Sequence, residues 1–90
     1  MKNVKNPKKK ELIKKVMHDP SAINIGKNGI TDQVIIEIKK SLKSNRIIKL
    51  KFLKSILDDH DIKELSKEIL EKTNAILIDS RGHNIIISKT

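Results

Sequence analysis

The chain has 90 residues, with 20 Lys and Arg against 11 Asp and Glu, a net charge of +9, no Cys, no Trp, no Tyr and a single Phe. This length fits one domain, and the lack of Cys excludes disulfides, thiolate metal sites and cysteine nucleophiles. Apolar runs reach only three or four residues, so neither a membrane span nor a signal peptide is expected. We expect a cytoplasmic protein with a flexible basic segment at residues 1–6 and a single domain over residues 7–90.

The positive charge is unevenly distributed along the chain. Residues 1–51 hold 14 basic and 4 acidic side chains, whereas residues 52–90 hold 6 basic and 7 acidic ones. A one-sided excess of this kind is typical of a protein with a cationic face for a polyanionic partner. A lysine-rich surface that only keeps the protein in solution is the alternative interpretation.

The first half of the chain predicts helix, strand, loop and helix. Asn6 and Pro7 fit an N-cap and first helical position, and the apolar spacing predicts a lysine-rich amphipathic helix over residues 7–18. A short strand follows at residues 22–25, and then the segment Gly26-Lys27-Asn28-Gly29. Thr31 is the expected N-cap of a second helix. Its inward stripe is Ile35, Ile38 and Leu42, widened by Val34, and its outward lysines are Lys39, Lys40 and Lys43.

The second half predicts strand, helix and a strand pair. Residues 46–53 alternate between apolar and basic side chains, which indicates a half-exposed strand. A loop leads to a third helix ending at Asn74, and residues 58–61 (Asp-Asp-His-Asp) supply its N-cap and acidic first turn. Strands are expected at residues 75–78 and 83–89, with a turn at residues 79–82 between them. The run Ile85-Ile86-Ile87 is apolar on both faces, which favours an interior strand.

This order, α-β-α-β-α-β-β, predicts a small α/β sandwich. Right-handed crossovers place the second and third helices on one face of the sheet. When the strands are numbered along the chain and the last one is interior, the order across the sheet is 1-2-4-3. The fourth strand is then antiparallel to its neighbours, the second and the third. The helix at residues 7–18 is an addition at the N-terminal end.

The segment Gly26-Lys27-Asn28-Gly29 is the clearest candidate for a binding site. Glycines let the backbone turn sharply and approach a ligand, and the helix that follows offers unpaired N–H groups and the positive end of its dipole to a phosphate. Lys27 adds a cation, and Asn28 a donor or a left-handed turn residue. An ordinary tight turn is the alternative, because Asn-Gly is a common turn pair.

The same segment resembles a known family. The run from Ile25 to Thr31, continuing through Glu37-Ile38 and Leu42 to the strand at residues 46–51, is similar to the CRM domain (chloroplast RNA splicing and ribosome maturation), whose stand-alone members are the YhbY-like proteins. The resemblance covers residues 8 to 88. It implies the fold of the C-terminal domain of translation initiation factor 3. It also implies binding to RNA, in bacteria to precursors of the large ribosomal subunit and in plants to group II introns, and so a role in ribosome maturation or in RNA folding or splicing.

The resemblance implies an RNA surface at the GxxG loop and the basic side chains near it. The candidate residues are Gly26, Lys27, Asn28, Gly29, Lys8, Lys9, Lys14, Lys15, Lys39, Lys40 and Lys43. Because the only ring, Phe52, is assigned to the core, bases have no aromatic platform on which to stack. We therefore expect recognition of structured RNA by its phosphates, riboses and shape. Ribosomal RNA or a pre-ribosomal particle is the expected partner of a monomer.

Two other classes of function fit the charge. One is an architectural protein that coats duplex DNA, and the other is a peripheral membrane or protein-interaction module that uses the basic helix at residues 7–18. An enzyme is not expected, because Ser, His and Asp occur without a nucleophile elbow or a paired catalytic constellation. The isolated residues His18, His60 and His83 lack metal-ligand spacing, so no metal or cofactor is expected.

Overall fold

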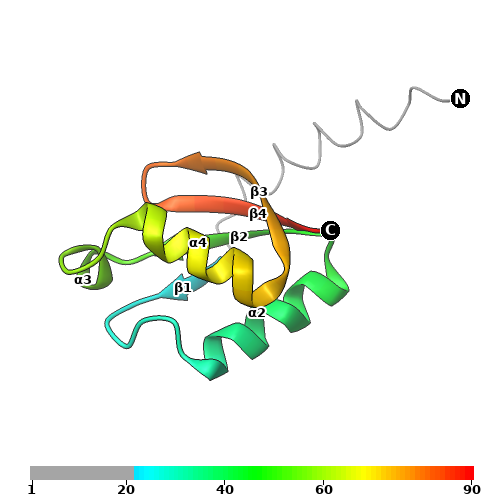
Figure 1. The fold of residues 1–90 in the computed structure, drawn as a ribbon, viewed down its shortest axis with the longest axis horizontal. Coiled ribbons are helices and arrows are strands. Elements are labelled where there is room, and N and C mark those ends of the chain that lie inside the picture. Colours follow the sequence, from blue (N-terminus) through cyan, green and yellow to red (C-terminus); the bar gives the residue numbers. More distant parts are fainter. Residues whose placement is uncertain (1–21) are drawn as a thin grey trace, which may run out of the picture.

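The computed structural model describes residues 22–90 of the chain (Figure 1). The predicted basic segment at residues 1–6 and the predicted helix at residues 7–18 lie outside the described residues. The described elements are β1 (Ile23–Ile25), α2 (Asp32–Ser44), β2 (Ile47–Phe52), α3 (Lys54–Leu57), α4 (Ile62–Thr73), β3 (Ala75–Arg81) and β4 (Asn84–Lys89).

The four strands form one mixed sheet in the order β1-β2-β4-β3. β1 and β2 are parallel, and β4 pairs antiparallel with both β2 and β3. The predicted strand order and the antiparallel fourth strand are therefore confirmed. The physical reason is visible in the run Ile85-Ile86-Ile87, whose three side chains are all buried. A strand that is apolar on both faces is most stable in the interior of the sheet.

Both long helices lie on the same face of the sheet, as predicted (Figure 1). The core between the two layers combines Ile38 of α2 and Ile69 of α4 with Leu50 and Phe52 of β2. All four side chains are fully buried. Burial of each such side chain contributes about 1.5–3 kcal/mol to folding, so this cluster is the main source of stability and fixes the positions of the loops at the sheet ends.

The helix ends follow the sequence signals. The hydroxyl of Thr31 accepts a hydrogen bond from the N–H of Val34 at 3.2 Å and caps α2. The carboxylate of Asp61 accepts from the N–H of Lys63 at 3.2 Å and caps α4. Asn74 ends α4 in the left-handed conformation, with φ 56°. Each cap satisfies a backbone group that the helix itself leaves unpaired.

The segment after β2 differs from the prediction. Residues 54–57 were expected to be loop, but they form the single helical turn α3, with Ile56 buried beneath it. Four residues give no measurable helical period, so the sequence pattern carries no signal for this element. The turn exists because Ile56 packs into the core.

The final hairpin is also tighter than predicted. β3 continues to Arg81, so Asp79, Ser80 and Arg81 belong to the strand and the turn consists of Gly82 and His83. The register shifts by one residue between Leu77 and Asp79, which is a β-bulge at Ile78. Turn-forming composition favoured a loop here, but pairing with β4 overrides it.

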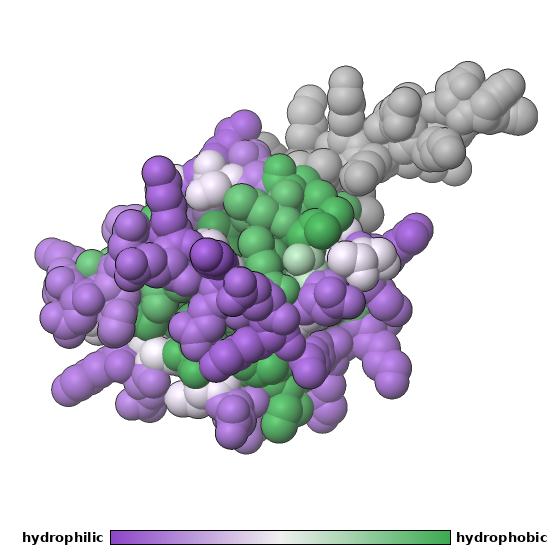
Figure 2. Space-filling model, in the orientation of Figure 1, coloured by the Kyte–Doolittle hydropathy of each residue, from purple (hydrophilic) through white to green (hydrophobic). Residues whose placement is uncertain are grey.

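The face that carries the helices is mostly hydrophilic, with hydrophobic residues gathered over β3 (Figure 2). Ile76 and Leu77 of this edge strand are about half exposed. Within residues 22–90, no helix has the length and apolar character needed to cross a membrane.

Candidate nucleic-acid interface

The glycine segment forms a closed turn between β1 and α2. The N–H of Gly29 donates to the carbonyl oxygen of Gly26 at 2.8 Å, and Lys27 and Asn28 occupy the two central positions with exposed side chains. Gly29 has φ +76°, a region that side-chain-bearing residues rarely adopt. The left-handed role predicted for Asn28 is wrong, because among the described non-glycine residues only Asn74 has a positive φ. Asn28 is exposed, and its role as a hydrogen-bond donor to a ligand stays a prediction.

The first glycine serves close packing rather than a special backbone angle. A Cβ added at Gly26 would lie 3.2 Å from Cδ1 of Leu53 and 3.8 Å from the hydroxyl oxygen of Ser55. A Cβ added at Gly29 would lie 3.9 Å from Cδ1 of Ile56. The turn therefore rests against the junction of β2 and α3, which holds Lys27 and Asn28 in a defined place at the sheet end.

This contact brings residues to the loop that sequence reasoning missed. Leu53 and Ser55 are exposed and form the wall against which Gly26 packs. Ser55 adds a hydroxyl next to the turn, and the exposed Lys54 lies between these two residues in the chain. No sequence signal identifies this segment, because it lies more than 20 positions along the chain from Lys27 and only the parallel pairing of β1 with β2 brings it close.

The start of α2 adds a partial positive charge behind the loop. The Thr31 cap orients the first turn, and the dipole of the helix points its positive end towards the glycine segment. Asp32 lies in that first turn and is exposed, so its carboxylate opposes an approaching phosphate. The attraction at this site therefore rests on the exposed ammonium group of Lys27 and on the turn geometry more than on the helix end.

The three predicted lysines of α2 lie far from the loop. At 1.5 Å per residue, Lys39 and Lys43 are roughly 12 and 18 Å along the helix from Thr31. Both line a shallow hollow of about 250 Å³, and Lys40 is exposed outside that lining. The other lining residues are Leu42, Thr73, Asn74 and Lys89.

The C-terminal ends of α2 and β4, whose residues line this hollow, lie at the opposite end of the sheet from the loop (Figure 1). The N–H of Lys89 donates to the carbonyl oxygen of Arg46 at 3.0 Å, just before β2 begins, whereas the N–H of Leu53, just after β2 ends, donates to Ile25 next to the loop. Lys89 is a further cation that sequence reasoning did not assign. The structure thus separates the predicted residues into two positively charged regions, and Lys8, Lys9, Lys14 and Lys15 lie outside the described residues.

Three titratable groups of α4 and its cap, Asp61, Glu68 and Lys72, make local structural contacts. Asp61 caps α4, and among residues 22–90 no three His, Cys, Asp or Glu side chains are grouped so as to hold a metal ion. Lys72 and Glu68 form an ion pair of 2.8 Å on the surface of α4. The hydrogen bond and charge of Glu68 raise the pKa of Lys72. This exposed pair, four residues apart on one helix, is a local surface contact.

Comparison with known proteins identifies the family. The model of the CRS1/YhbY (CRM) domain matches residues 5–89, so the chain belongs to this family. Among solved structures, the chain is similar to the solution structure of the hypothetical protein SAV1595 from Staphylococcus aureus, described as a candidate RNA-binding protein. The two share 31% sequence identity over 92% of this chain and 85% of that one, with a TM-score of 0.67. A search among curated proteins gave no match.

Proposed function

We propose that this protein binds structured RNA by its phosphate backbone, with the turn at residues 26–29 as the central contact. The observation that supports this most is the turn itself. It holds Lys27 and Asn28 exposed at the end of β1, directly before the positive end of α2, in a chain of the CRM family. Backbone N–H groups and a lysine in this arrangement fit a phosphate oxygen.

The expected partner is a folded RNA rather than a single strand. Phe52, the only Phe, Tyr or Trp in the sequence, is fully buried, so none of the large aromatic rings on which single-strand readers stack bases is available. Contacts then fall on phosphates and 2′-hydroxyls, which a folded RNA presents in fixed positions. We place the protein in the cytoplasm, as a monomer acting in maturation of the large ribosomal subunit.

A competition titration tests RNA binding. Structured ribosomal RNA, single-stranded RNA of equal length and duplex DNA compete for the protein at two salt concentrations. We expect a preference for structured RNA that persists at the higher salt. Equal affinities that fall together with salt would instead favour an architectural protein that coats DNA. Co-sedimentation with large-subunit precursors tests the ribosomal assignment, and sedimentation equilibrium tests the monomer.

The role of the loop is tested with the variant Lys27→Ala/Asn28→Ala. Both side chains are exposed, so the fold is expected to persist. The affinity for RNA should fall several-fold, and the negative slope of log affinity against log salt should become less steep by about 0.7–0.9, the value for one phosphate contact. Lys67→Ala is the matched control, because it removes an exposed charge from α4. An unchanged affinity and slope in the loop variant would show that the loop does not bind RNA.

A further inference from the structure

The sheet face without α2 and α4 carries a polar row at the same end as the glycine loop. Side chains of directly paired residues lie on the same face of a sheet. Asn24 pairs with Lys51, Lys51 with Asn84, and Asn84 with Arg81. The neighbours Ile25, Phe52 and Ile85 point into the core, so this row of four side chains, one from each strand, lies on the opposite face.

The β-bulge at Ile78 determines that Arg81 belongs to this row. Before the bulge Leu77 pairs with Ile87, and after it Asp79 pairs with Ile86. Without the extra residue Asp79 would pair with Ile85, and the side chains of Asp79 and Arg81 would point to the helix side of the sheet. The bulge therefore moves a guanidinium group onto the face that carries Lys51.

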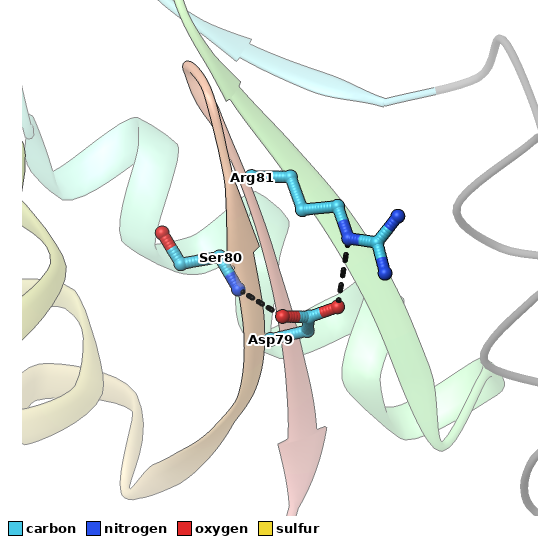
Figure 3. Close-up of polar contacts among 3 residues, drawn as sticks. All are labelled: Asp79, Ser80 and Arg81. Atoms are coloured by element: carbon cyan, nitrogen blue, oxygen red, sulfur yellow. Dashed lines mark hydrogen bonds and ion pairs between the residues drawn. The ribbon is translucent and has the colours of Figure 1, made fainter.

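The guanidinium group of Arg81 contacts Asp79 through Nε, and the side chain is largely exposed to solvent. Its Nε donates to the Asp79 carboxylate at 3.3 Å, and the second oxygen of that carboxylate accepts from the N–H of Ser80 at 2.8 Å. Figure 3 shows that Nε makes this contact and that the dashed line does not extend to the two terminal nitrogens of Arg81. The Arg81 side chain is 72% exposed. Two parallel N–H donors in this position match the oxygens of a phosphate.

We propose that the row Asn24, Lys51, Asn84 and Arg81 is a second RNA-backbone contact that extends the glycine loop across the sheet. The row crosses three strand spacings, roughly 14 Å, a length that follows several successive phosphates of one strand. Lys51 and Arg81 bind phosphates. The side-chain amides of Asn24 and Asn84 can donate to and accept from 2′-hydroxyls. The row and the loop are contiguous, because Asn24 precedes Gly26 by two residues.

The charges around the row favour this partner. Asp79 is the acidic side chain next to the row, and its carboxylate is engaged by Arg81 and Ser80. Asn24, Lys51 and Arg81 are all exposed. The row has two cations and no aromatic ring, so it suits a sugar-phosphate backbone and offers nothing for base stacking.

The test compares two double variants with equal loss of charge. Lys51→Gln/Arg81→Gln removes both cations of the row, and Lys63→Gln/Lys67→Gln removes two exposed cations from α4. Circular dichroism and thermal unfolding establish that both variants keep the fold. In titrations of structured RNA we expect the row variant to bind about tenfold more weakly. The negative slope of log affinity against log salt should become less steep by about 1.4–1.8, the value for two phosphate contacts. The change should be smaller in the α4 variant.

This proposal rests on the proposed RNA binding, and the experiment distinguishes failure of the row from failure of the RNA-binding function. If the unmodified chain shows no preference for RNA, the proposed function is wrong and the row has no assigned partner. If the unmodified chain binds RNA and the row variant matches the α4 variant in affinity and slope, only the row is refuted. A variant with Lys51→Gln alone keeps the Asp79 to Arg81 pair intact. Its slope of log affinity against log salt should become less steep by about 0.7–0.9. An unchanged slope in that variant also refutes the row.

Discussion

The left-handed turn residue Gly29 gives the sharpest test of the loop geometry. With φ +76° and the nearest atom 3.9 Å from an added Cβ, Gly29→Ala introduces backbone strain but no steric clash. The strain is about 1–2 kcal/mol. Alanine also lowers the conformational entropy of the unfolded chain relative to glycine, which stabilises the folded state by about 0.4–1 kcal/mol. We therefore expect a net loss of about 1 kcal/mol in the free energy of unfolding, which corresponds to a fall in Tm of about 4–8 °C for a domain of this size.

Two companion variants separate strain from other effects. Gly29→Asn should lose less stability than Gly29→Ala, because Asn tolerates the left-handed region better than Ala. Gly26→Ala has no strain of this kind. The tightest contact of its Cβ is with the end of the partly exposed Leu53 side chain at 3.2 Å. This side chain can move aside, so a loss within about 0.5 kcal/mol is expected.

Urea denaturation of the three variants measures these differences at constant m-value. RNA affinity is measured at a temperature where every variant is folded. Gly29→Ala should weaken binding because it disturbs the turn that presents Lys27, and Gly29→Asn should restore part of it. If Gly29→Ala is as stable as the parent chain, or if Gly26→Ala proves the more damaging of the two, the assignment of the two glycines is wrong.

Three further outcomes are expected. Thr31→Ala should lower the free energy of unfolding by about 1 kcal/mol through loss of the cap on Val34, and Thr31→Ser should retain most of it; equal losses in the two variants would mean that the hydroxyl does not cap the helix. Asp79→Asn should raise the affinity for structured RNA at low salt, because it removes the negative charge next to the proposed row; a fall or no change would show that no phosphate lies there. The pKa of Lys72 is raised above its ordinary 10.5 by Glu68, so the stabilising effect of this pair is fully present below pH 10.5 and is lost as the pH rises through the higher folded-state pKa. Since the pair is exposed, Lys72→Ala should change the stability at neutral pH only slightly. The check is to compare the Tm of the parent chain and of Lys72→Ala at pH 7 and pH 11. A large difference in Tm between the two proteins at pH 7 that disappears at pH 11 would contradict the prediction.

Several features of the fold could be predicted because their causes are local. Ile35, Ile38 and Leu42 recur at helical spacing and are all buried in α2. Thr31 and Asn74 stand where a cap and a left-handed end are needed. Strand order also followed from the chain, because a strand apolar on both faces must be interior and crossovers have one hand.

Other features depended on contacts between distant parts of the chain. α3 forms because Ile56 packs into the core, and four residues carry no periodic signal of their own. The segment Asp79-Ser80-Arg81 has turn-forming composition, yet pairing with β4 keeps it in the strand. Both errors share a cause, since local preferences of about 1 kcal/mol or less are overridden by burial and sheet pairing.

The candidate site also combines features determined by the local sequence with features that depend on contacts between distant residues. The sequence alone determined that a positively charged chain carries a turn at residues 26–29, since glycine, lysine and asparagine have conformational and chemical preferences that need no neighbours. Only the tertiary structure decided what surrounds that turn. It brought Ser55 to the loop, placed Lys39 at the opposite end, and aligned Arg81 with Lys51 through a one-residue bulge. Register and packing are set by the whole sheet, so a shift of one residue reverses which face a side chain occupies.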